Sequence, residues 1–163
     1  DADVIGDVNK GWLVARVTLG NERLSIGGGS GAQSGFSADD LIALLDAAPP
    51  ELAAGLRDRA GAVIAEGHTL RLLNLRRISR AIAGTGPGPE GNVTKLVVAE
   101  QGQRQTELGM KLAGAAAVTG QTPALTQAYL GYRAMTIAGG TSEITRNTIA
   151  ERILGLPRDP LLK

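Results

Sequence analysis

Apolar residues recur along most of the chain at steps of three and four positions, the spacing that places side chains on one face of an α-helix. The stretch from residue 10 to 27 shows this spacing at Leu13, Val17, Leu24 and Ile26. A period of two, which indicates a strand, occurs only among the first few residues. The pattern therefore predicts an almost entirely helical chain that begins with the exit from a strand.

Turn-forming residues divide the helical pattern into segments. Five glycines occur within residues 27–35, which indicates a loop after the first helix. A short helix is predicted from Ser37, a suitable cap, to Ala47. Further helices are expected over residues 50–83, 89–112, 124–137 and 142–154. The small residues between 113 and 123 are interpreted as a connector.

About four of the predicted helices are long, and the connections between them are short. This organisation is typical of an all-α fold, an up-down antiparallel four-helix bundle with a short extra terminal helix. The chain starts at Asp1 without an initiating Met or a leader. We therefore expect a fragment or an isolated domain.

Composition narrows the classes of function. The chain has 163 residues, 43% apolar and 20% charged, as in an ordinary soluble globular domain. Its 17 basic and 16 acidic residues nearly balance, so nucleic-acid binding is not predicted. Because the chain has no cysteine and one histidine, His68, no metal site is predicted. No apolar run approaches the roughly 20 residues of a membrane span, and a cytoplasmic location is expected.

Aromatic residues are rare: the chain has one Trp, two Tyr and one Phe. The core is therefore expected to consist of Leu, Ile, Val and Ala. Two alternatives stay open for the apolar helix faces, which are completed either within the chain or by another chain.

Two glycines, Gly139 and Gly140, precede the predicted start of the last helix. Thr141 or Ser142 is a suitable N-cap, and Glu143 lies in the first turn, where the helix dipole favours a negative charge. Exposed backbone N–H groups at such a helix start can bind a phosphate, or the turn can simply be well capped and bind nothing. The charge of Glu143 disfavours a free phosphate and favours a ribose hydroxyl or an amide edge.

The segment GGTSEITRNTIAERILGLPR, residues 139–158, closely resembles the C-terminal signature of acyl-CoA dehydrogenases. Residues 11–29, 56–77 and 86–114 resemble other stretches of that family in the same order. The resemblance covers nearly the whole chain. It implies that residues 10–163 form the C-terminal helical bundle of the family, and residues 1–9 the end of a strand of its β-domain.

The resemblance also implies an activity. Family members use FAD to oxidise an acyl-CoA thioester to its 2,3-enoyl form, while a carboxylate removes the proton from the α carbon. An electron-transfer flavoprotein then reoxidises the flavin. We expect acyl-CoA as substrate, a homo- or hetero-tetramer, and no activity in the isolated fragment, which lacks most of the family's cofactor-binding parts.

The resemblance offers two positions for the base. Many members have a glutamate before Gly-Thr-Ser, where this chain has Gly139. Another branch places the base on the first helix, which corresponds to Glu22; Asn21 and Arg23 beside it are then expected to contact the substrate. Burial against an apolar acyl pocket would raise the pKa of such a glutamate toward neutrality.

An alternative for Glu22 is an ordinary exposed residue that Arg23 neutralises. The chain would then be a non-catalytic assembly domain, or the subunit of a heteromeric complex whose active carboxylate lies on another chain.

Cofactor residues follow from the same resemblance. Gly140, Thr141 and Glu143 match positions that contact FAD, and Gly114 matches a glycine that approaches a flavin across a subunit interface.

Two features of the sequence depart from the family. Lys111 stands where Gln is common, and no Arg-x-x-Phe-Gly element follows the first long helix.

Overall fold

The computed structural model describes residues 4–27, 35–84 and 90–158, with the side chains of residues 20–27 excluded. Within these ranges the chain forms seven helices and no strand. They are α1 (Gly11–Gly27), α2 (Ala38–Ala47), α3 (Pro50–Ile82), α4 (Glu90–Ala113), α5 (Ala115–Val118), α6 (Pro123–Met135) and α7 (Ser142–Arg152). The all-α class is therefore confirmed.

Most predicted helix bounds lie within one or two residues of those observed. The exception is the connector after α4, in which the four residues of α5 form one further turn of helix. Residues 4–10 form bends and a turn, in which the Lys10 N–H donates to the Asp7 carbonyl at 3.0 Å. Assignment of residues 1–9 to a strand of a β-domain, and of residues 10–163 to the bundle domain, stays a prediction.

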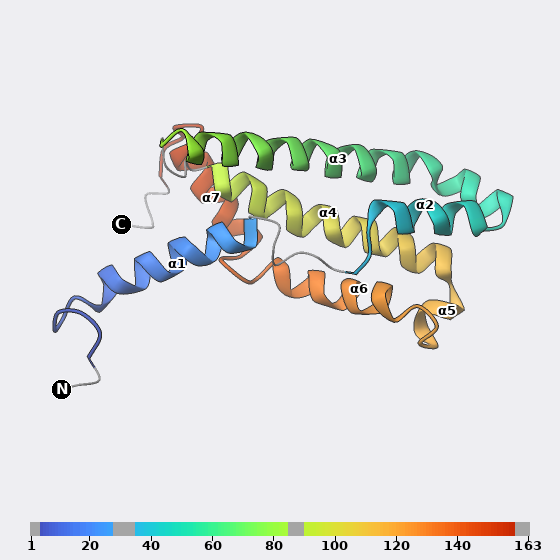
Figure 1. Ribbon diagram of the computed structural model, residues 1–163, viewed down its shortest axis with the longest axis horizontal. Helices are drawn as coiled ribbons and strands as arrows, with labels where there is room; N and C mark the ends of the chain where they lie inside the picture. The colour runs from blue at the N-terminus through green and yellow to red at the C-terminus, as the bar shows by residue number, and fades with distance from the viewer. Residues whose placement is uncertain (1–3, 28–34, 85–89, 159–163) are drawn as a thin grey trace.

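The long helices run up and down beside one another, as predicted for an antiparallel bundle (Figure 1). Helix α4 is central, because it packs against α1, α2, α3, α6 and α7. Figure 1 shows α5 at one end of the bundle and α7 at the other, with the start of α1 projecting beyond the bundle. We call these the α5 end and the α7 end.

Local chemistry explains where α2 begins. The Ser37 hydroxyl accepts a hydrogen bond from the Asp40 N–H at 3.1 Å, and the Asp40 carboxylate accepts one from the Ser37 N–H at 2.7 Å. This reciprocal capping box satisfies two backbone donors that the helix start leaves free. The cap predicted at Ser37 is confirmed.

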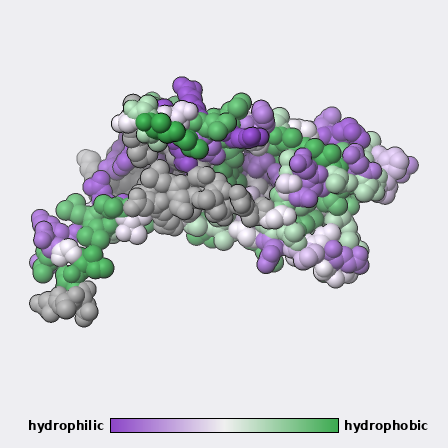
Figure 2. Space-filling view, viewed as in Figure 1, coloured by the Kyte–Doolittle hydropathy of each residue, from purple (hydrophilic) through white to green (hydrophobic). Residues whose placement is uncertain are grey.

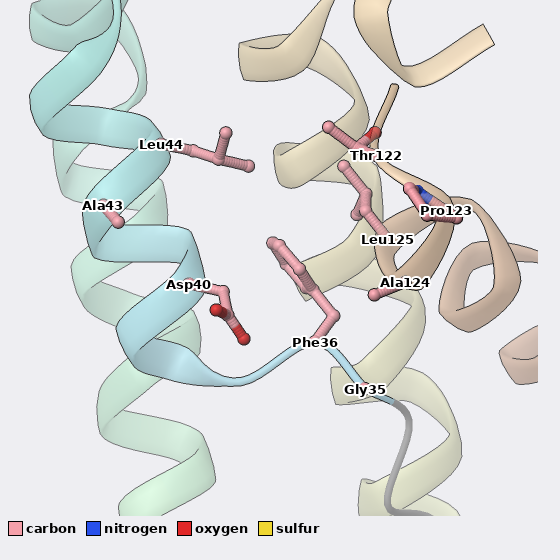
Figure 3. A pocket seen from close by; sticks show the side chains of 9 residues that line it. All are labelled: Gly35, Phe36, Asp40, Ala43, Leu44, Thr122, Pro123, Ala124 and Leu125. Carbon is pink, nitrogen blue, oxygen red and sulfur yellow. The ribbon is translucent and has the colours of Figure 1, made fainter. Parts of the chain in front are cut away.

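The apolar core lies at the α5 end. It joins α2 and the residue Phe36 before it, the first half of α3, the second half of α4, α5 and the first half of α6. Its members are Phe36, Leu41, Leu45, Ala53, Leu56, Ala60, Val63, Leu108, Leu112, Ala117, Leu125 and Ala128. Gly109 permits this packing, because a Cβ there would lie 2.7 Å from Phe36 and from Leu125. Between α2 and α6, Phe36, Leu44 and Leu125 line a hollow of about 310 Å³ (Figure 3).

Large apolar side chains remain exposed on α1 and on the second half of α3. They are Trp12, Leu13, Val17 and Leu19 on α1, and Leu72, Leu75, Ile78 and Ile82 on α3. Figure 2 shows the corresponding hydrophobic surface at the side of the molecule that carries the chain start and the α7 end. Within the described part of this chain nothing buries these apolar side chains.

Candidate functional site

The glycine turn before α7 is left-handed at two successive residues. Gly139 has a φ of 67° and Gly140 a φ of 104°, values that residues with a Cβ rarely adopt. Thr141 follows as N-cap, and its hydroxyl accepts from the Ile144 N–H at 3.3 Å. The predicted N-cap is thus observed, and we call residues 139–143 the α7 mouth.

Polar side chains lie beneath the α7 mouth. Lys95 of α4 is only 1% exposed, and its ammonium donates a hydrogen bond to the Gly140 carbonyl. Ser142 and Thr145 of α7 are also buried. The Ser142 hydroxyl has no hydrogen-bond partner among the described residues. Buried polar groups of this kind are costly in a purely structural role and are frequent at functional sites.

A polar cleft of about 550 Å³ opens at the α7 mouth. It lies between α4, the segment after α6 and α7, and its lining residues are Glu100, Gln103, Arg104, Glu107, Thr136, Ile137, Thr141, Ser142, Glu143 and Arg146. The cleft therefore presents hydroxyls, carboxylates and guanidinium groups within one space. Such a lining suits a polar ligand that both donates and accepts hydrogen bonds.

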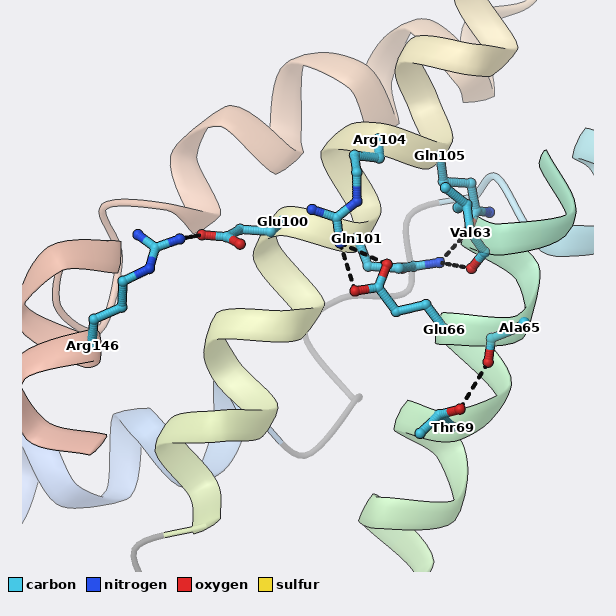
Figure 4. Close-up of polar contacts among 9 residues, drawn as sticks. All are labelled: Val63, Ala65, Glu66, Thr69, Glu100, Gln101, Arg104, Gln105 and Arg146. Atoms are coloured by element: carbon cyan, nitrogen blue, oxygen red, sulfur yellow. Dashed lines mark hydrogen bonds and ion pairs between the residues drawn. The ribbon is translucent and has the colours of Figure 1, made fainter. Parts of the chain in front are cut away.

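Ion pairs hold the charged lining of the cleft. Arg146 pairs with Glu100, and the Arg104 guanidinium reaches both carboxylate oxygens of Glu66 at 2.6 Å (Figure 4). Because these side chains are partly exposed, each pair contributes at most about 1 kcal/mol to stability. Their main effect is to fix the directions of the guanidinium groups across α3, α4 and α7.

Arg133 of α6 supports the opposite side of the cleft. Its guanidinium donates to Glu107 and to Gln103 at 2.9 Å each, and it lies 4.4 Å from the centre of the Tyr129 ring. The charge is thus held by a carboxylate and an aromatic face together. Sequence reasoning did not single out this residue.

A chain of buried amides fixes the rotation of α4. The Gln101 amide donates to the Val63 carbonyl at 3.2 Å and to the Gln105 side chain at 2.8 Å (Figure 4). Gln105 in turn donates to the Phe36 carbonyl at 3.3 Å. Gly67 allows this approach, because a Cβ there would lie 3.0 Å from the Gln101 nitrogen.

Glu143 lies exposed at the cleft edge, in the first turn of α7. Hydrogen bonds from its own backbone N–H and from the Thr141 hydroxyl lower the pKa of its carboxyl group, and the charges of Arg146 and Lys95 lower it further. Glu143 is therefore ionised at neutral pH. It acts there as a hydrogen-bond acceptor, which agrees with the preference for a hydroxyl or an amide over a free phosphate.

The structure does not bring Gly114 to the α7 mouth of its own chain. Gly114 follows the C-terminal end of α4, with a φ of 55°, whereas Lys95 lies near the other end of this helix. A helix of 24 residues is about 36 Å long. The predicted contact of Gly114 with a flavin across a subunit interface stays a prediction.

Glu22, Asn21 and Arg23 lie in the second half of α1. Their side chains fall outside the described residues, so the roles predicted for them are not tested. Figure 1 shows that this half of α1 lies toward the bundle, at the same end as α7. Gly139, where many family members carry the base, has a backbone conformation that disfavours glutamate.

The described part of the chain contains no cluster of three acidic or histidine side chains placed to bind a metal ion. None of its helices is long and apolar enough to cross a membrane.

Residues 9–154 match the family described as acyl-CoA dehydrogenase, C-terminal domain. The chain belongs to the acyl-CoA dehydrogenase family. The predicted resemblance is thereby confirmed, and the helical bundle is the C-terminal domain of that family. The α7 mouth and the cleft before it therefore belong to an acyl-CoA dehydrogenase domain.

Two relatives match nearly all of this acyl-CoA dehydrogenase domain. Acyl-CoA dehydrogenase FadE34 of Mycobacterium tuberculosis is 34% identical over 158 residues, which are 97% of this chain and 21% of that protein. Acyl-CoA dehydrogenase IpdE1 of the same organism is 36% identical over 169 residues, covering 98% of this chain and 42% of the relative. The chain thus spans about a fifth of the length of FadE34 and about two fifths of the length of IpdE1. No solved structure matches it.

Proposed function

We propose that the chain is the C-terminal domain of a flavin-dependent enzyme that oxidises an acyl-CoA thioester to its 2,3-enoyl form. One observation carries the proposal: the family's Gly-Thr-Ser segment forms a capped helix start that opens onto a polar cleft of about 550 Å³. A merely structural turn needs neither the cleft nor the buried cation beneath it.

The residues at the α7 mouth fit part of a flavin cofactor. The Thr141 hydroxyl and the Glu143 N–H, which donate to the Glu143 carboxylate, can instead donate to carbonyl or phosphate oxygens of a bound ligand. The ionised Glu143 can accept from a ribityl or ribose hydroxyl, and the two glycines leave the approach free of side chains. In this proposal, Gly140, Thr141 and Glu143 hold FAD, and Gly114 contributes from a neighbouring subunit.

The proposed base is Glu22 of α1. Bound FAD supplies an acceptor for the hydride that leaves the β carbon. Glu22 takes the proton from the α carbon, and Asn21 and Arg23 contact the substrate. A carboxylate facing an apolar acyl group has a raised pKa and is therefore a stronger base than one in water.

Glu22→Gln tests this assignment. We expect the variant, made in the complete protein, to keep the flavin absorption spectrum and to lose roughly 10²- to 10⁴-fold in dye-linked oxidation of acyl-CoA, the usual contribution of a general base. Glu51→Gln, which changes an exposed glutamate at the start of α3, is the matched control and should keep full activity.

One result would contradict the assignment of the base, and another would contradict the dehydrogenase activity itself. Undiminished oxidation in Glu22→Gln means that the base is another group. A complete protein that binds no FAD and oxidises none of a panel of acyl-CoAs is not a dehydrogenase. For the 163-residue chain alone we expect no turnover, and a measurable rate with added FAD would overturn that expectation.

The proposal extends to partners and location. An electron-transfer flavoprotein is the expected electron acceptor, and a homo- or hetero-tetramer the expected assembly. We place the enzyme in the cytoplasm, with acyl-CoA as its small-molecule substrate.

A second candidate function is assembly without catalysis. The exposed stripe of Leu72, Leu75, Ile78 and Ile82 on α3 favours it, because these four side chains share one helix face and are each at least half exposed. Such a face is typical of a contact with another subunit. In a heteromeric complex, the working carboxylate could then belong to the partner chain.

The mass of the assembly tests this candidate. Leu75→Arg should dissociate the complete protein, as measured by light scattering, since a charge in an apolar contact is costly. Leu52→Arg, on the first half of the same helix, should leave the mass unchanged. A mass unaffected by Leu75→Arg would exclude this stripe as the assembly surface.

A further inference from the structure

Lys95 is the one ionisable side chain among the buried residues of the described part of the chain. It is 1% exposed, whereas the other buried polar side chains are neutral hydroxyls and amides. An ammonium group taken out of water loses much of its favourable hydration even after the protein has relaxed around it. A methionine of similar length would fill the same volume without this cost, so packing alone does not explain the lysine.

The position of Lys95 adds to that cost. Its ammonium group lies at the N-terminal end of α7, where the helix dipole is positive. Two groups at the α7 mouth offset the charge: the Gly140 carbonyl accepts the hydrogen bond, and the exposed carboxylate of Glu143 attracts it.

The Gly139–Gly140 turn needs such an anchor. Glycine adopts several backbone conformations at little cost, so two in succession do not by themselves hold one geometry. The hydrogen bond from Lys95 reaches across 45 residues of sequence and connects the turn to the most enclosed helix of the bundle. It therefore fixes the direction in which Thr141 and the first N–H groups of α7 point.

We propose that Lys95 is a positioning residue for the ligand bound at the α7 mouth. By holding the Gly140 carbonyl, it orients the glycine turn so that the Thr141 cap and the Glu143 carboxylate face the cleft. The ligand identity, FAD, rests on the proposed function. Lys95 itself acts only through the turn.

Lys95→Met in the complete protein tests the proposal with two readouts. The first is hydrogen exchange of the amides of residues 139–146, which include the Ser142 N–H bonded to the Thr136 carbonyl at 3.1 Å. We expect this exchange to quicken at least tenfold. The second is the dissociation constant of FAD, which we expect to rise about tenfold.

Thr106→Val is the matched control, because it removes another buried polar group of α4, whose hydroxyl donates to the Gly102 carbonyl at 2.8 Å. It should leave both readouts at the mouth unchanged. If Lys95→Met does not fold, Lys95→Leu, which also removes the hydrogen-bond donor, serves the same comparison.

Every outcome of these two measurements either supports or overturns the proposed role of Lys95. Faster local exchange together with weaker FAD binding supports the proposal. Unchanged FAD affinity, or unchanged exchange at residues 139–146, overturns it. If the unmodified protein binds no FAD, the proposed function fails by itself, and the exchange measurement still decides whether Lys95 holds the turn.

Discussion

The two ends of α4 differ in what they bury. Near its C-terminal end, at the α5 end of the bundle, Leu108 and Leu112 join a continuous apolar core. Near its N-terminal end, Thr94 and Lys95 are buried instead, and the Lys95 ammonium donates to the Gly140 carbonyl just before α7. The same helix therefore contributes to stability through one half and to a polar site through the other.

The α7 end also differs from the core in what it exposes to solvent. The second half of α3 and the described part of α1 expose large apolar side chains, whereas the neighbouring interior at the α7 end contains buried polar groups. An arrangement of this kind is poor for the stability of an isolated bundle. It is reasonable for a domain whose α7 end binds a ligand and meets other protein surfaces.

The largest predicted effect contrasts two leucines. Leu41→Ala, at a fully buried position of the α5 end, should lower the free energy of unfolding by about 2–5 kcal/mol. Leu72→Ala, the same change at an exposed position of α3, should alter it by about 0.5 kcal/mol or less. Urea unfolding of both variants measures the difference. A large loss for Leu72→Ala would show that another surface covers that face.

A smaller effect concerns two glycines. A methyl group at Gly102 of α4 would overlap the Tyr132 ring of α6, so Gly102→Ala should cost about 1–3 kcal/mol. Gly61→Ala, on an open face of α3, should instead stabilise by about 0.5–1 kcal/mol, because nothing lies near its added methyl group. Equal thermal shifts for the two variants would contradict the close approach of α4 and α6.

The smallest effect concerns the cap of α2 at the α5 end. Ser37→Ala should lower stability by about 1 kcal/mol at neutral pH. The Ser37 N–H and hydroxyl lower the pKa of Asp40 below its ordinary 3.8, so the stability that these two bonds to the carboxylate contribute is present above that pH and is lost as pH falls through the lowered pKa. The difference between the two proteins should therefore become smaller in acid without vanishing, because the Ser37 hydroxyl still accepts from the Asp40 N–H. Persistence of the full difference in acid would argue against the reciprocal cap.

Sequence periodicity predicted the helices well, because helix formation depends on neighbours three and four residues away. Ser37 and Pro50 marked helix starts by chemistry that acts over a few residues. Helix α5 was missed since its four small residues, Ala115–Val118, have no apolar periodicity to detect.

The candidate site was predictable only in part. The Gly-Gly-Thr segment predicted the capped start of α7, because an N-cap depends only on residues a few positions away in the chain. Nothing in the sequence distinguished Lys95 or Arg133 from other charged residues on amphipathic helices. The apolar neighbours of Lys95 in the sequence were the only indication that it is buried. This indication is ambiguous, because lysine often lies along an apolar surface with its charge in water.

The amino-acid sequence by itself determined the helices and the caps at Ser37 and Thr141, because each depends on interactions between residues close together in the chain. Only the tertiary structure decided which faces are buried. The rotation of α4 places Lys95 under α7 and leaves the leucines of α3 exposed. Burial depends on which distant helices pack together, so residues 45 positions apart can define one site.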